Sequence, residues 1–225
     1  MYHLAGNHEW YQRLGRARTA QLLGVPGGRF FRSAVPSPGV RLIFLDTFTV
    51  SALAWPPGSR QREEAQALLD LHNPGAEDKN SPDKLAGAAR RWVKLNGGLG
   101  GEQLAWLDAE LASAFAEQQK VLLFSHVPLH PKAQSWQCGR MCTAWDGEEA
   151  VAVLRRWPGV VAAAFAGHDH FGGAAYDAAA KTHFVTLQGV IETKPGDTSF
   201  GEVELFADGS VRLTGHGRMR SRRMR

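Results

Sequence analysis

Three short polar motifs carry the side chains best suited to chemistry, and each follows an apolar stretch. The motifs are Gly6-Asn7-His8-Glu9, Ser125-His126-Val127-Pro128 and Gly167-His168-Asp169-His170. The apolar stretches before them are residues 2–5, 121–124 and 160–166. We expect each stretch to be a strand, and functional groups of layered α/β folds gather where strands end. The chain therefore predicts one site built from three strand ends.

The donors in these motifs suit a borderline divalent cation. They are an amide oxygen of Asn7 and the imidazoles of His126, His168 and His170, which suit Mn²⁺, Fe²⁺ or Zn²⁺. The motifs contain no thiolate, which argues against a closed structural zinc site. Residues two apart in an extended chain point the same way. We therefore expect His168 and His170 to serve one cluster while Asp169 faces elsewhere.

Helices and strands alternate along the chain that must position these motifs. We expect helices at residues 9–23, 60–71, 102–115 and 148–156, and strands at residues 2–5, 30–31, 40–45, 121–125, 160–166, 183–190, 202–206 and 211–214. The helix after Gly101 has one apolar face, formed by Leu104, Leu107, Leu111 and Phe115. Asp208-Gly209 marks a hairpin near the end. This order predicts a layered α/β fold with mixed sheets.

A glycine-rich stretch, residues 96–101, precedes that helix. It could cradle a phosphate, but the Lys-Ser/Thr ending of a P-loop is absent. We expect a flexible start to the helix instead.

The basic charge of the chain is concentrated at its end. The net charge is +4, and without the five arginines of residues 217–225 it is −1. We therefore expect a domain over residues 1–216 and a basic tail over residues 217–225. The tail is either a solvated, frayed end or a segment that contacts an acidic partner.

The remaining composition excludes some classes of protein. Apolar residues make up 44% of the 225 residues, as in a folded globular protein, and no stretch approaches the roughly 20 apolar residues of a membrane helix. No signal peptide is visible. We expect a cytoplasmic location, no membrane insertion and no nucleic-acid partner. Cys138 and Cys142 are too few for a structural zinc site, and we expect free thiols.

The three motifs, in this order, resemble the later motifs of the calcineurin-like metallophosphoesterases. The similarity is closer to one branch, the manganese-dependent ADP-ribose/CDP-alcohol diphosphatases, and spans nearly the whole chain. The run Leu187 to Thr193 is the part most specific to that branch. Other segments that carry the resemblance are Asn73-Pro74, residues 78–82, residues 96–98, residues 103–107, Trp145, Phe200-Gly201 and residues 215–218.

The resemblance implies a four-layer α/β/β/α sandwich with two divalent ions, Mn²⁺ first among the candidates. In such proteins the groups matching Asn7, His126 and His168 hold one ion, and the group matching His170 binds the other. The histidine matching His8 stays free of metal and handles protons. The ions lower the pKa of water and neutralise charge on phosphoryl oxygens. Glu192 is expected to support the site from outside it.

One departure from the family pattern concerns carboxylates. The family's first two motifs, an Asp-x-His or Asp-x-Gln and a Gly-Asp-x-x-Asp, precede Gly-Asn-His-Glu and supply most of the acidic ligands. They have no counterpart here, so we expect an N-terminally truncated sandwich, about the C-terminal two-thirds of the fold. The aspartates nearest in kind are Asp46, Asp146, Asp169 and Asp177, none of them in a matching motif.

The expected activity is a phosphoric anhydride hydrolase. The resemblance implies cleavage of ADP-ribose or of CDP-alcohols (CDP-choline, CDP-ethanolamine, CDP-glycerol) to a nucleoside monophosphate and a phosphorylated product, impaired in the truncated chain. The partner is then a small nucleotide-diphosphate substrate. Two alternatives stay open: a non-catalytic remnant that binds a metal or a nucleotide, and an incomplete gene model of the active enzyme.

Overall fold

Two β-sheets of unequal size form the centre of the molecule in the computed structural model, which describes all residues 1–225. The larger sheet has six strands in the order β1-β2-β3-β4-β6-β5. Its strands are β1 (Arg32–Ser37), β2 (Val40–Phe44), β3 (Lys120–Phe124), β4 (Val161–Ala166), β5 (Gly173–Asp177) and β6 (Thr182–Thr186). Strands β2, β3, β4 and β6 run parallel, while β1 and β5 pair antiparallel at the edges. The larger sheet is therefore mixed, as predicted.

The smaller sheet is an antiparallel meander of β7 (Ser199–Leu205), β8 (Val211–Gly217) and β9 (Arg222–Met224). The predicted hairpin joins β7 to β8, and Gly209 there adopts a left-handed φ of 82°. Strand β9 lies within the predicted tail and pairs with β8. The segment is thus not a frayed end, although the domain boundary at residue 216 stays a prediction.

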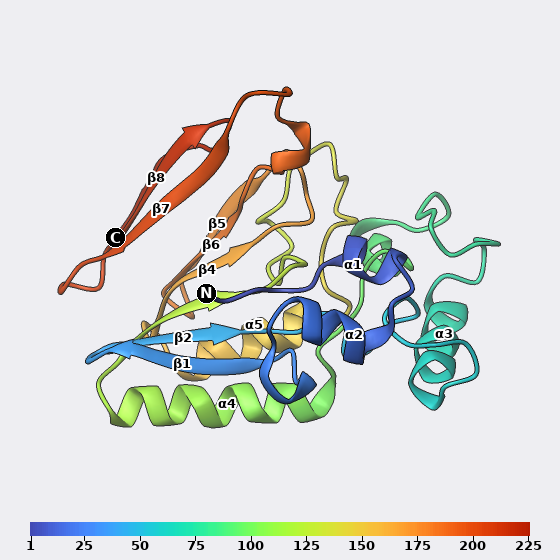
Figure 1. Cartoon of the computed structure of the whole chain (residues 1–225), viewed down its shortest axis with the longest axis horizontal. Helices are drawn as coiled ribbons and strands as arrows, with labels where there is room; N and C mark the ends of the chain where they lie inside the picture. Colours follow the sequence, from blue (N-terminus) through green and yellow to red (C-terminus); the bar gives the residue numbers. More distant parts are fainter.

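Helices cover one face of the large sheet and the small sheet covers the other (Figure 1). Alternate residues of β3 show the two faces: Val121 and Leu123 pack toward the layer of α4 (Gly100–Ala116) and α5 (Gly147–Arg156). Leu122 between them packs with Leu213 and Met224 of the small sheet. These contacts give three layers in the order α/β/β, so this chain does not form the second helical layer of the expected four-layer sandwich (Figure 1).

The remaining helices lie beside the sheets rather than on them (Figure 1). They are α1 (Asn7–Tyr11), α2 (Gly15–Leu22) and α3 (Arg60–His72), with short 3₁₀ turns η1 (Pro26–Gly28), η2 (Gly87–Arg91) and η3 (Val190–Glu192). The single helix predicted over residues 9–23 is wrong, because Arg13 has a left-handed φ of 54° and the helix breaks there. The strand predicted over residues 2–5 is also wrong, since that segment joins no sheet.

Helix α4 begins at the glycine-rich stretch. Two backbone amides, of Leu99 and Gly100, donate to the two carboxylate oxygens of Asp146 at 2.9 and 2.8 Å. Burial raises the pKa of this Asp146 carboxyl. The start of α4 is therefore held by a remote side chain rather than flexible. Along the helix Leu107 and Leu111 are buried as predicted, but Phe115 is exposed and reaches only the ring of Trp157.

No helix in the chain combines the length and the apolar character needed to cross a membrane. The strand predicted over residues 30–31 is wrong, because the first strand, β1, begins at Arg32. Strands β5 and β9 were also not predicted from the sequence, because both are short and carry little apolar alternation.

Candidate metal centre

The parallel strands bring two of the histidine motifs to the same edge of the large sheet. Strand β3 ends at Phe124 and β4 at Ala166, so His126 and His168 each stand two residues beyond a strand end. The backbone amide of Gly167 donates to the carbonyl oxygen of His126 at 2.9 Å. This bond joins the two loops directly, so the two imidazoles are held side by side.

Asn7 reaches the same place from the first helix. The Gly6 amide donates to the Glu9 carboxylate at 2.6 Å, which fixes the start of α1. Within α1 the Asn7 Nδ2 group donates to the Tyr11 hydroxyl, one turn later, at 3.1 Å. The Asn7 Oδ1 atom therefore remains free to face the histidines.

Three donor atoms converge at this point. His126 Nε2 lies 2.9 Å from Asn7 Oδ1, and His168 Nδ1 lies 3.2 Å from Asn7 Oδ1 and 3.3 Å from His126 Nε2. Neighbouring ligands about 2.1 Å from one divalent ion are separated by about 3 Å when they meet at right angles. The spacing and the nitrogen and oxygen chemistry of these three atoms fit one such ion.

Electrostatics favour the neutral imidazoles that a metal requires. Burial, reinforced by neighbouring histidines, holds the pKa of His126 well below its usual value. Burial, with the charge of His170, lowers the pKa of His168 to about 4. Both rings are therefore neutral at neutral pH, and each has a nitrogen lone pair available for a metal ion.

The backbone at His168 is strained. Its φ of 67° is left-handed, a conformation that costs a residue other than glycine on the order of 1–3 kcal/mol. The turn over residues 167–172 is closed by the Asp169 amide bonding to the Gly167 carbonyl at 2.8 Å and the Gly172 amide to the Asp169 carbonyl at 3.0 Å. The extended chain assumed from the sequence is thus wrong, and a turn orients His168 instead.

His170 and His8 lie beside the three-atom cluster, in the same cleft of about 540 Å³. The His170 Nδ1 atom pairs with the Glu192 carboxylate at 2.9 Å, so the expected support from Glu192 goes to His170. The His8 ring is exposed and its centre lies 6.5 Å from that of His170. Four of the five predicted site residues thus line the cleft, and the fifth, Asn7, contacts His126 and His168; their individual roles stay predictions.

Carboxylates do not join the three-atom cluster. Asp169 faces away from it, as expected, and accepts hydrogen bonds from the Ser135 amide and hydroxyl. Asp46 pairs with Arg16, Asp146 caps α4, and Asp177 pairs with Arg155. All four aspartates considered as replacements for the missing acidic ligands are therefore engaged in structural contacts.

His130 and Trp145 do not line the cleft. His130 is buried beside Asp177, with its ring 5.0 Å from that of Phe184. Trp145 is also buried, donates to the Val93 carbonyl at 3.2 Å and stacks on Trp92. Trp145 is therefore a core residue.

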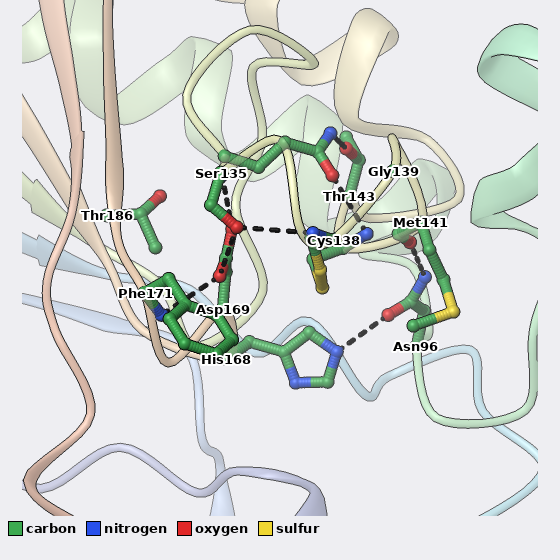
Figure 2. The surroundings of a disulfide bond; sticks show 12 residues. Asn96, Ser135, Cys138, Gly139, Met141, Thr143, His168, Asp169, Phe171 and Thr186 are labelled. Atoms are coloured by element: carbon green, nitrogen blue, oxygen red, sulfur yellow. Dashed lines mark hydrogen bonds between the residues drawn. A yellow bond between two sulfur atoms is a disulfide. The ribbon is translucent and has the colours of Figure 1, made fainter. Parts of the chain in front are cut away.

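A loop behind the cluster carries a disulfide between Cys138 and Cys142, so the expectation of free thiols is wrong (Figure 2). The Cα atoms lie 5.9 Å apart, within the range for a disulfide. An oxygen of Asp169 lies within 4.8 Å of both sulfurs. Bonded to each other, the sulfurs are not available as thiolate ligands.

Comparison with known proteins assigns the chain to a family. It is 39% identical over 220 residues to a manganese-dependent ADP-ribose/CDP-alcohol diphosphatase from Oryza sativa, a match that covers 97% of this chain and 66% of that protein. It is 35% identical over 223 residues to the protein of the same name from Arabidopsis thaliana, covering 98% and 69%. The chain belongs to the manganese-dependent ADP-ribose/CDP-alcohol diphosphatase family.

The fold agrees with this family assignment. The chain matches the crystal structure of a dimetal phosphatase from Danio rerio with a TM-score of 0.87 and 33% identity, over 99% of this chain and 71% of that one. No family model matches the chain. This member of the diphosphatase family spans about two thirds of the length of the curated relatives given above. The metallophosphoesterase-type fold predicted from the sequence is thereby confirmed.

Two residues of the site were not predicted from the sequence. Tyr11 holds Asn7, and its position four residues later on a helix is a signal that could have been used. Asn96 contacts His168 across 72 residues of sequence, and nothing local to either residue indicates that contact.

Proposed function

We propose that this chain forms the metal-binding part of a hydrolase that cleaves the diphosphate of ADP-ribose or of a CDP-alcohol such as CDP-choline, CDP-ethanolamine or CDP-glycerol. The products are a nucleoside monophosphate and a phosphorylated sugar or alcohol. The convergence of Asn7 Oδ1, His126 Nε2 and His168 Nδ1 supports this proposal, in a chain whose relatives are named for manganese and for these substrates.

The residues divide into two groups toward the metal. Asn7, His126 and His168 hold one ion. His170, whose Nδ1 atom is engaged by Glu192, offers Nε2 to the other. A bound divalent ion lowers the pKa of water and neutralises charge on phosphoryl oxygens.

His8 is the residue proposed to move a proton. It lines the cleft, and no hydrogen bond or ion pair engages its ring, so its nitrogens are free to meet a substrate. A histidine there protonates the leaving phosphate as a general acid, an effect typically worth about 10² to 10⁴ in rate. The cleft volume of about 540 Å³ falls in the range of small-molecule sites.

The deciding experiment measures Mn²⁺-dependent hydrolysis of ADP-ribose and CDP-choline by chromatography of the products. The samples are this chain and the same chain extended upstream by the family's two aspartate motifs. We expect weak hydrolysis by the chain alone, because its cluster holds no carboxylate, and full hydrolysis by the extended chain. His126→Ala should abolish it, whereas His183→Ala, on a histidine that contacts Arg225 far from the cleft, should not. Absence of hydrolysis in both samples refutes the proposal.

The absence of a carboxylate from the cluster favours a second candidate, a chain that binds one ion without turnover. Metal content after dialysis against Mn²⁺ separates the two. Two tightly bound ions per chain exclude the non-catalytic candidate, and one ion without hydrolysis supports it. The cytoplasmic location and the absence of nucleic acid among the partners stay predictions of the sequence.

A further inference from the structure

Asn96 is a fully buried polar residue at the start of the glycine-rich stretch. The two glycines that follow it, Gly97 and Gly98, are packed closely against neighbouring segments. A Cβ on Gly97 would lie 2.5 Å from the Thr47 carbonyl oxygen, and one on Gly98 would lie 3.0 Å from the Asp146 carboxylate. The Asn96 side chain is thus held in a fixed place against the loop behind the metal centre.

The orientation of the Asn96 amide follows from its neighbours (Figure 2). Its Nδ2 group donates to the carbonyl oxygens of Arg91 and Met141, both at 2.7 Å. A flipped amide would place Oδ1 against these two carbonyl oxygens, where no proton is available. Oδ1 must therefore face the other way, toward His168 Nε2 at 2.9 Å.

This orientation decides which nitrogen of His168 carries the proton. An amide oxygen only accepts hydrogen bonds, so Nε2 must be the protonated nitrogen of the neutral ring. The lone pair of His168 is then on Nδ1, the atom that faces Asn7 Oδ1 and His126 Nε2. The opposite tautomer would set an N–H in the place where an ion belongs.

We propose that Asn96 is a positioning residue that holds His168 in the Nε2–H tautomer and directs its Nδ1 lone pair at the metal centre. The proposal rests on the metal site of the proposed function. Partners that orient metal-binding histidines in this way typically change metal affinity by about 10- to 100-fold. Asn96→Leu should therefore weaken Mn²⁺ binding by that factor.

The chain offers a matched control in Asn73. This residue is also fully buried, and its Nδ2 group also donates to two carbonyl oxygens, of Ser81 at 3.1 Å and Trp92 at 2.9 Å. Its Oδ1 atom has no partner. Asn73→Leu therefore loses the same two amide bonds as Asn96→Leu but no contact with a histidine, and it should bind Mn²⁺ like the unchanged protein.

The tautomer is read directly from the metal-free protein by nitrogen-15 NMR of the histidine side chains, with the His168 signal assigned from His168→Gln. We expect Nε2–H in the unchanged protein. Asn96→Leu should show a mixture of tautomers, and calorimetry with Mn²⁺ should show the loss of affinity.

Two results would overturn the proposal: an Nδ1–H signal for His168 in the unchanged protein, or Mn²⁺ affinity in folded Asn96→Leu equal to that in Asn73→Leu. If Asn96→Leu does not fold, the tautomer of the unchanged protein still decides. Because the tautomer is measured without metal or substrate, a failure of the hydrolysis assay leaves this result standing and the two failures remain distinct.

Discussion

Replacing Gly6 by alanine should displace His126 from the metal centre. The backbone at Gly6, with φ −109° and ψ −177°, is open to alanine, so the effect comes from space alone. A Cβ there would lie 2.5, 2.6 and 2.8 Å from three atoms of the His126 ring. Ordinary Cβ contacts begin at 3.4 Å, so the ring must retreat by the difference of 0.9 Å from the nearest contact.

A displacement of that size is large for a metal ligand. Distances in a metal site are held to about 0.2 Å, so the retreat should lower Mn²⁺ affinity at least about 100-fold, or about 2.7 kcal/mol. Overpacking of this kind also costs about 1–3 kcal/mol of folding free energy. Calorimetric titration with Mn²⁺ measures the first quantity, and denaturant unfolding in chelator measures the second.

Gly167 provides the matched control. It also approaches the His126 ring, but a Cβ there would lie 3.7 Å from Nδ1, an ordinary contact. Gly167→Ala should therefore bind Mn²⁺ within a few fold of the unchanged protein. Equal Mn²⁺ affinity in Gly6→Ala and Gly167→Ala would show that the position of His126 is not set by the glycine before α1, and the reasoning would fail.

Three other outcomes are expected. Hydrogen bonds from Arg155 lower the pKa of Asp177 to about 2, so this carboxylate stabilises the fold above about pH 4, and the contribution is lost as the pH falls through 2. Since half of Arg155 is exposed, Asp177→Asn should lower the free energy of unfolding at pH 7 by about 1–2 kcal/mol and flatten its change between pH 4 and 2 in denaturant titrations. Gly217→Ala should lower the free energy of unfolding by about 3 kcal/mol, because Gly217 has a φ of 63° and a Cβ there would overlap the Thr198 carbonyl oxygen. The amides of the small sheet should then exchange hydrogen faster, and unchanged protection would contradict this. Mn²⁺ at 100 times its dissociation constant should raise the free energy of unfolding by about 2.7 kcal/mol, reversed by chelator, and no shift in the melting temperature would argue against a preformed site.

The sequence by itself predicted the donors that we propose for the metal centre. His126 and His168 each follow an apolar stretch and a small residue, and this local pattern placed them correctly beyond the ends of strands β3 and β4, whereas Asn7 begins helix α1 and follows no strand. Parallel strands then share an edge as a matter of topology, so β3 and β4 had to bring His126 and His168 together. The periodicity of α4 and α5 and the hairpin at Asp208-Gly209 were local signals too, and they predicted those elements correctly.

Only the tertiary structure decided how the donors are aimed. His168 was expected to point into the site from an extended chain, yet a left-handed turn orients it, and Asn96 from a distant loop selects its nitrogen. The pairing of Glu192 with His170 and the closure of the Cys138–Cys142 loop also depend on how separate segments meet. Residue type and spacing are local properties of the chain, so they indicate which side chains follow the end of a strand. The protonated nitrogen of a buried ring depends on the atom packed against it, and that atom is chosen by contacts between residues far apart in sequence.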